Sequence, residues 1–273
     1  VPYPSAKGTL TFNLESFALP NLQLDKSIPA AFNGGVATTF MYTAAASEKL
    51  GFAISSITST ASDLVLTYSF QQPDGTVIAT CSAQAATAAA PSSCDVKTAV
   101  AGVHKVVITP SKNVAATAVV TLTKDKAYTI ASDGTVTNFT STLPGKNANI
   151  VFPATAGTTY TLKLSGSTFP GSNPVVVKDT SLKAVASGTF GNMSSNSTIL
   201  VIFTAAKTGN YTITLSPAGD AIGSVDFKVV VGSTAANDSF YNKQVIAMAD
   251  RRPPLGLLVR PFSSFVPSSA TAI

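Results

Sequence analysis

The sequence predicts an all-β protein: two tandem antiparallel β-sandwich domains, Ig-like or jelly-roll-like, with extended arms at both ends. The first observation is composition. Thr, Ser, Val, Ala and Gly are abundant, only 11% of residues are charged, and the residues that favour helices are sparse. The second is a period-two alternation of apolar residues between turn residues. The third is an internal repeat with a shift of about 110 residues.

Two ungapped matches define the repeat. "FMYTAAASEKLGFAIS" (40–55) lies over "IVFPATAGTTYTLKLS" (150–165), and "GVHKVVITPSKNVAATAVVTL" (102–122) lies over "GNYTITLSPAGDAIGSVDFKV" (209–229). Apolar residues match in alternation, as Phe52 does with Leu162, which places one row of side chains in a core and the other in water. We therefore predict an N-terminal arm (1–20), two sandwiches (21–125 and 126–232) and a C-terminal arm (233–273).

The strands follow from this alternation. In the first repeat we expect strands at 36–43, 49–57, 63–70, 75–80, 103–109 and 116–123. The "QPDGT" at 72–76 predicts a hairpin turn, because Asp-Gly supplies the positive φ that a tight turn requires. In the second repeat we expect strands at 147–153, 158–165, 174–178, 182–187, 198–204, 210–216 and 223–231. About seven short strands per 100 residues is typical of a β-sandwich.

The pair "FPATAGTTYTLKLSG" and "KTGNYTITLSPAGDAIGSVDFKV" resembles the β-sandwich repeats found in tandem in large secreted bacterial surface proteins. The layout is similar to that of bacterial pre-peptidase C-terminal modules. The first repeat keeps the "PDGT" hairpin and the second reads "VVKDTSLKAV" instead. The resemblance covers about residues 30–231 and implies a passive module, a spacer, stalk or binding accessory, with no catalytic residues to carry over.

Residues for catalysis are scarce, and we predict no enzyme, no cofactor and no metal site. His104 is the only histidine, and it takes the position of Tyr211 in the other repeat, so we expect a half-buried strand residue. Two cysteines and one histidine leave too few ligands for a zinc site. "SDG" (132–134) and "NDS" (237–239) hint at calcium, but turn chemistry explains both.

Charge and hydropathy limit the partners. The net charge of +5 comes from scattered lysines, so we predict no nucleic-acid partner. No apolar run reaches 18 residues, so we predict no membrane span. "VPYPSAKG" has the character of a mature start after signal removal, which favours a secreted protein at an extracellular surface. Five N-x-S/T sequons permit a glycan: Asn138, Asn192, Asn196, Asn210 and Asn237.

Cys81 and Cys94 bracket a flexible stretch, "SAQAATAAAPSS". A disulfide at the base of this loop is the favoured interpretation in a secreted chain, and two separate buried thiols are the alternative.

The two arms carry the candidate interface. Near the N-terminus, "GTLTFNLESFALPN" is a strand that either adds to its own sandwich or is donated to a neighbouring subunit. The C-terminal "ADRRPPLGLLVRPFSSFVP" (249–267) holds all three arginines, and its prolines favour an extended apolar segment docked on a surface. The predicted interface residues are Leu10, Phe12, Leu14, Phe17, Arg251, Arg252, Leu255, Leu257, Leu258, Arg260, Phe262 and Phe265.

These observations predict a non-enzymatic extracellular structural protein, a subunit of a filament, sheath or surface layer. Copies would assemble head to tail through the arms, because heterologous contacts that do not close give fibres. The alternatives are an adhesin or carbohydrate-binding accessory module, and a virion structural protein.

Overall fold

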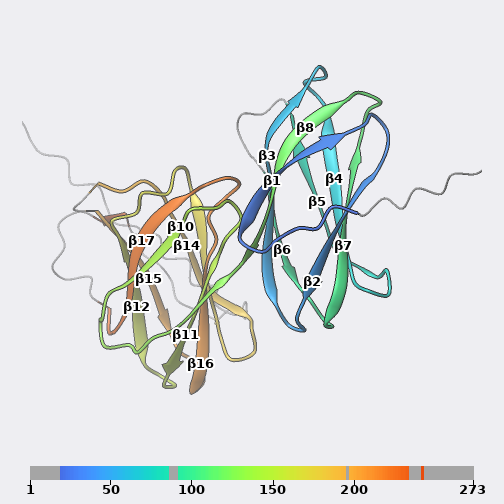
Figure 1. Ribbon diagram of the computed structural model, residues 1–273. Coiled ribbons are helices and arrows are strands. Elements are labelled where there is room, and N and C mark those ends of the chain that lie inside the picture. The colour runs from blue at the N-terminus through green and yellow to red at the C-terminus, as the bar shows by residue number, and fades with distance from the viewer. Residues whose placement is uncertain (1–18, 86–91, 195–196, 234–240, 243–273) are drawn as a thin grey trace, which may run out of the picture.

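The computed structural model describes residues 19–85, 92–194, 197–233 and 241–242. Within these residues every regular element is a strand, as the sequence predicts, and the strands form two sandwiches joined directly to each other (Figure 1). The first sandwich contains β1 (Lys26–Phe32), β2 (Thr38–Ala44), β3 (Lys49–Ser59), β4 (Val65–Gln71), β5 (Val77–Gln84), β6 (Ser92–Lys97), β7 (Gly102–Pro110) and β8 (Ala116–Lys124). The second contains β9 (Lys126–Thr129), β10 (Thr137–Ser141), β11 (Ala148–Ala154), β12 (Thr159–Ser165), β13 (Asn173–Lys178), β14 (Ala184–Phe190), β15 (Thr198–Thr204), β16 (Gly209–Leu215), β17 (Gly223–Val231) and β18 (Tyr241–Asn242).

The two sandwiches share one topology. The first has sheets β1-β8-β3-β6 and β2-β7-β4-β5, and the second has β10-β17-β12-β15-β18 and β14-β13-β16-β11-β9. Replacing β1 by β10, β2 by β11 and so on up to β8 by β17 converts the first order into the second, apart from β9 and β18. These two strands are also the exceptions to antiparallel pairing, since each is added in parallel to an edge. The sequence repeat is therefore a repeat of strand order.

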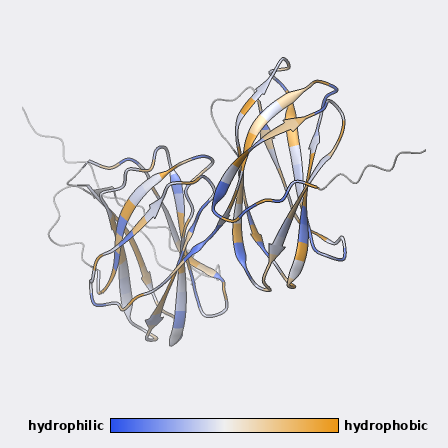
Figure 2. Ribbon diagram, viewed as in Figure 1, coloured by the Kyte–Doolittle hydropathy of each residue, from blue (hydrophilic) through white to orange (hydrophobic). Residues whose placement is uncertain are grey.

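Each sandwich buries its own apolar core, and hydrophobic and hydrophilic residues alternate along the strands (Figure 2). In the first, Phe52 contacts the rings of Tyr68 and Phe70. In the second, Phe152 and Phe203 both contact the ring of Tyr211. Burial of such side chains stabilises a fold by roughly 1.5–3 kcal/mol each. The aromatic side chains of these two clusters face inward, as the alternation along the strands predicts.

The turns follow the predicted chemistry. At "QPDGT" the amide of Gly75 donates to the carbonyl of Gln72 (2.9 Å), and the φ of Gly75 is 88°. At "SDG", Asp133 Oδ1 accepts a hydrogen bond from the amide of Thr135 (2.9 Å), which is the side-chain turn expected there. The "NDS" at 237–239 lies outside the described residues.

Five strands are absent from the prediction: β1, β6, β9, β10 and β18. β1 contains Pro29, which a strand tolerates at an edge, and β1 is the edge of its sheet. β6 has a serine-rich start, "SSCDVK", which reads as part of the loop between the cysteines. The remaining three have five residues or fewer, too short for periodicity to identify them.

Candidate functional site

The predicted interface residues of the arms lie outside the described residues. This holds for Leu10, Phe12, Leu14, Phe17, Arg251, Arg252, Leu255, Leu257, Leu258, Arg260, Phe262 and Phe265. The sites that the structure does place are the disulfide, His104 and the junction between the sandwiches.

Cys81 and Cys94 form a disulfide, as the favoured interpretation predicts. Cys81 lies on β5 and Cys94 on β6, and these strands are edges of the two different sheets of the first sandwich. The bond therefore joins the two layers across one open side of the sandwich, at a Cα–Cα distance of 6.1 Å.

His104 lies inside the first sandwich and is 2% exposed, so it is more buried than the half-buried residue that the sequence predicts. Its strand position matches that of Tyr211. His104 pairs with Tyr42, Tyr211 pairs with Phe152, and Tyr42 corresponds to Phe152 in the repeat. Nδ1 donates to the carbonyl of Gly102 (3.0 Å), and the buried Nε2 has no partner among the described residues. Within the described part of the chain, no hydroxyl or carboxylate is therefore hydrogen-bonded to this ring.

The junction consists of one linking residue and the loop before β11. Asp125 alone separates the end of β8 from the start of β9. Its carboxylate accepts hydrogen bonds from the amide of Asn147 (3.3 Å) and from Nδ2 of Asn149 (2.7 Å). Both asparagines are buried. The linker is thus fixed by the second sandwich at the point where it leaves the first.

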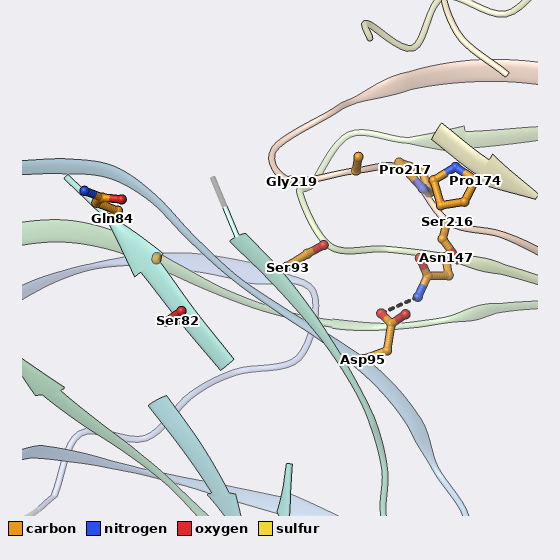
Figure 3. Close-up of a pocket in the computed structure, with 11 residues that line it drawn as sticks. Ser82, Gln84, Ser93, Asp95, Asn147, Pro174, Ser216, Pro217 and Gly219 are labelled. Atoms are coloured by element: carbon orange, nitrogen blue, oxygen red, sulfur yellow. Dashed lines mark hydrogen bonds between the residues drawn. The ribbon is translucent and has the colours of Figure 1, made fainter. Parts of the chain in front are cut away.

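The same asparagines reach back to the first sandwich. Nδ2 of Asn147 donates to Oδ1 of Asp95 on β6 at 2.7 Å (Figure 3). Nζ of Lys49, at the start of β3, donates to Oδ1 of Asn149 at 2.7 Å. Each asparagine therefore bridges Asp125 to a strand of the first sandwich, which holds the two domains together on either side of the linker.

The two backbones touch at a pair of glycines. A Cβ atom at Gly51, on β3, would lie 1.6 Å from the carbonyl oxygen of Gly145 in the second sandwich. Gly51 matches Thr161 in the repeat, so the strand itself does not require a glycine there. The absence of a side chain instead allows the loop of the second sandwich to lie against the sheet of the first.

Burial shifts the ionisation of the junction. It raises the pKa of Asp125, and the nearby Asp95 carboxylate acts in the same direction. It also lowers the pKa of Lys49, which Asp125 partly offsets. Both shifts favour the uncharged forms, so the contact works chiefly through hydrogen bonds that the two asparagine amides complete.

A second set of contacts fixes the end of β8. Glu48 accepts hydrogen bonds from the hydroxyl of Tyr42 (3.0 Å) and the amide of Ala45 (3.1 Å), and it forms an ion pair with Lys124 (2.7 Å). Burial alone would raise the pKa of Glu48, but these donors together hold it below its ordinary value. Lys124 immediately precedes the linker, so the strand is held up to its last residue.

An open cleft of about 550 Å³ lies between the sandwiches beside this junction (Figure 3). One wall comes from β5 and β6 with Ser82, Gln84 and Ser93, and the other from the loop after β16, residues 216–219. That loop is held by Asn173, whose Oδ1 accepts from the amide of Ala218 (2.8 Å). Among the described residues that line the cleft, hydroxyl, amide and carboxylate groups lie beside Ala83, Pro174, Pro217 and Ala218, and none of these residues is aromatic. The polar groups suit a ligand that forms hydrogen bonds.

Two kinds of site are missing from the described part of the chain. No three His, Cys, Asp or Glu residues there are grouped so that they could hold a metal ion. In the same residues no helix is long and apolar enough to cross a membrane.

The sequence reasoning missed the junction and the cleft. The signal that could have found them is a difference between the repeats. Lys49, Gly51 and Asp95 occupy positions that hold Thr159, Thr161 and Ile202 in the second sandwich. Gly51 is smaller than Thr161, Asp95 is polar where Ile202 is apolar, and Lys49 is charged where Thr159 is not. These differences on the outer face indicate a contact that only the first repeat makes.

No family model and no curated protein matches the chain. Among solved structures, tripeptidyl peptidase 2 is 12% identical with a TM-score of 0.28, over 77% of this chain and 24% of that one. The CUB1-EGF-CUB2 region of human MASP-1/3 is 8% identical with a TM-score of 0.24, over 75% and 99%. A secreted protein of Parabacteroides distasonis is 8% identical with a TM-score of 0.22, over 74% and 87%. This chain thus spans about a quarter of the peptidase, and similarities this weak carry no functional argument.

Proposed function

We propose that the protein is a non-enzymatic extracellular structural protein, a subunit that assembles head to tail with copies of itself into a filament, sheath or surface layer. The observation that carries the proposal is the fixed junction. One residue links the sandwiches, and Asn147 and Asn149 bridge it to β6 and β3. A unit of fixed geometry with an arm at each end suits repeated assembly, because the same contact is then propagated from one subunit to the next.

The disulfide supports the extracellular part of the proposal. Structural disulfides persist in oxidising compartments and are rare in the reducing cytosol. Cys81 and Cys94 are the only cysteines of the chain, and both are used in the bond. The assembly itself is proposed to run through the arms, whose sequences contain apolar residues and all three arginines of the chain.

Removal of residues 243–273 tests the assembly. We expect the full chain to form polymers that sediment and that negative-stain microscopy resolves, and the shortened chain to remain monomeric by light scattering. A parallel chain lacking residues 1–18 distinguishes the two interpretations of the N-terminal strand, since a donated strand is needed for assembly and an edge strand of the same domain is not.

The control for this experiment is a full-length chain in which Arg251, Arg252 and Arg260 are replaced by Lys. It keeps the charge and the apolar residues but loses the bidentate contacts of arginine, so we expect weakened assembly rather than none. Polymers of the shortened chain that match those of the full chain would show that the C-terminal arm is not the link.

The polar cleft favours a second candidate, a carbohydrate-binding module or adhesin. Its hydroxyl and amide groups, with Asp95 and Asn147 at one side, match the hydrogen-bonding groups of a sugar. None of the described lining residues is aromatic, so they do not supply the stacking on which sugar sites commonly depend. Binding on a glycan array that a Ser82→Trp substitution in the cleft abolishes would favour this candidate over the structural one.

A further inference from the structure

The edge of β6 is open in the described part of the chain. β6 pairs with β3 alone and is the last strand of its sheet. At other edges the chain adds a segment of its own: β9 pairs with β11, β18 pairs with β15, and Asn21 bridges to Met41 on β2. β15 is the counterpart of β6 in the repeat. Among the described residues, the first sandwich therefore lacks the strand that the second sandwich adds at this edge.

The hydrogen bonds between β3 and β6 show which backbone groups of β6 point away from the sheet. The amide of Thr98 donates to the carbonyl of Glu48 (3.0 Å), one position beyond the end of the ladder. Opposite residues of an antiparallel ladder alternate between hydrogen-bonded and non-hydrogen-bonded pairs. Counting back from Thr98, every second residue of β6 bonds to β3, and the others direct their amide and carbonyl groups off the edge. These others are Ser93, Asp95 and Lys97.

Two of these three residues line the cleft between the sandwiches. Ser93 and Asp95 lie on the β6 side of the cleft, and Figure 3 shows the loop of residues 216–219 across from them. That loop is held in place, because Oδ1 of Asn173 accepts a hydrogen bond from the amide of Ala218 (2.8 Å). The cleft thus has an open strand edge on one side and a fixed wall on the other.

We propose that the edge of β6 binds an extended segment of a partner protein, which enters the cleft as an added strand and places a basic side chain beside Asp95. Strand addition depends on a row of main-chain donors and acceptors, and Ser93, Asp95 and Lys97 present such a row. The row is long enough for a segment of about five residues, at roughly 3.3 Å per residue. The inference does not depend on the proposed assembly, because it concerns the described edge of a single chain.

Charge and size favour this occupant. Asp95 is the only charged residue among the described lining residues. Its Oδ1 accepts from Asn147, and its other carboxylate oxygen has no hydrogen-bond partner in the described part of the chain, so it can accept from lysine or arginine. A volume of about 550 Å³ suits a single segment and does not hold the edge of a second sandwich. A sugar would bind the side chains of the cleft but would not match the regular row of amides and carbonyls.

Amide hydrogen exchange, resolved by NMR, tests whether the edge is open. In the full chain without ligand, we expect the amides of Ser93 and Asp95 to exchange roughly tenfold faster or more than those of Cys94 and Val96, which bond to β3. Protection of all four amides would show that the edge is already covered, and would overturn the proposal. Protection of Ser93 and Asp95 that increases with protein concentration would assign the edge to a second copy of the chain, and would overturn it as well.

Selection from a display library of random heptapeptides on the full chain tests the ligand. We expect the enriched peptides to carry lysine or arginine and to slow the exchange of the Ser93 and Asp95 amides by about tenfold or more. The same peptides with glutamate in place of the basic residue should bind about tenfold more weakly. A library that yields no peptide, or peptides that leave these two amides unchanged, overturns the proposal. Binding on a glycan array without any enriched peptide overturns it in favour of the sugar candidate.

Two proline variants test the edge itself. Ser93→Pro removes an amide that points off the sheet, and an edge strand tolerates proline, as β1 does at Pro29. The matched control is Thr80→Pro, because the amide of Thr80 also points off its edge strand, β5, but Thr80 is not among the described residues that line the cleft. We expect Ser93→Pro to weaken binding of the selected peptides by about tenfold and Thr80→Pro to leave it unchanged.

Asp95→Asn tests the same site without a change in the backbone. The variant can still accept from Asn147, but it loses the negative charge, so it should lose most of the preference for basic over acidic peptides. Circular dichroism and urea unfolding establish that each variant is folded. An unchanged preference in Asp95→Asn, or equal weakening by Ser93→Pro and Thr80→Pro, would contradict binding at the β6 edge.

Discussion

Gly51→Ala is the sharpest test of the junction, because it adds a single methyl group at the point where the two sandwiches touch. The new Cβ would lie 1.6 Å from the carbonyl oxygen and 2.7 Å from the carbonyl carbon of Gly145, both backbone atoms. Ordinary carbon contacts begin near 3.5 Å, so the domains must separate by roughly 2 Å. No side-chain rotation can relieve the clash.

The separation removes the bridges around the linker. The Lys49–Asn149 and Asn147–Asp95 hydrogen bonds are both 2.7 Å long, and an increase of this size takes them beyond hydrogen-bonding distance. At about 1.5 kcal/mol for each bond to a charged group, the junction loses about 3 kcal/mol. The cores do not change, because Gly51 faces away from the interior and its equivalent, Thr161, is accommodated in the second sandwich.

Calorimetry and small-angle X-ray scattering measure this loss. We expect the variant to unfold in two separate transitions and to show a larger radius of gyration than the wild type, with unchanged circular dichroism. The matched control is Gly188→Ala, a strand glycine whose new Cβ would meet only side-chain methyl groups of Val201 and Val175. An unchanged scattering curve for Gly51→Ala, with the same single transition as the wild type, would refute the view that this contact sets the domain arrangement.

The other predictions concern the disulfide and the linker. Replacing Cys81 and Cys94 by Ala should lower the free energy of unfolding of the first sandwich by about 3 kcal/mol, and reductant should reproduce the loss in the wild type; equal urea midpoints with and without reductant would contradict it. Burial raises the pKa of Asp125 in the folded protein above its unfolded value of about 3.9. The contribution of this carboxyl to stability is therefore complete at pH values below the unfolded pKa, and it is lost as the pH rises through the folded pKa. Urea unfolding should therefore show that the stability of the wild type relative to Asp125→Asn increases as the pH falls from 7 toward 4. A stability difference that does not depend on pH would contradict a buried carboxyl with a raised pKa.

Much of the fold could be predicted because the chain contains two versions of the same pattern. Thirteen strands were expected at positions that β2–β5, β7, β8 and β11–β17 occupy, with ends that differ by a few residues. Alternation identifies a strand only when it is long enough and one face is apolar. Alternation does not identify β6, because only Cys94 and Val96 are apolar there and the serines before them resemble a loop. It does not identify β10, because Phe139 is the one large apolar residue of that strand.

The junction could not be predicted, for a different reason. Asn147 and Asn149 lie in or beside a strand whose alternation concerns the core, and their partners Asp95 and Lys49 are remote in sequence. Periodicity indicates which side chains of one sheet face inward, but it gives no information on how the sheets of two different domains contact each other. Only contrasts between the aligned repeats, such as Gly51 against Thr161 and Asp95 against Ile202, carried that information.

The one-residue linker has a mechanical consequence. A flexible linker between domains lengthens first under tension and at low force, and this delays the moment at which the domains themselves bear the pull. Here the slack is a single residue, at most about 3.6 Å of chain. A pull on the two ends therefore reaches the bonds of Asn147 and Asn149 almost at once, and the junction should yield before either core begins to unravel.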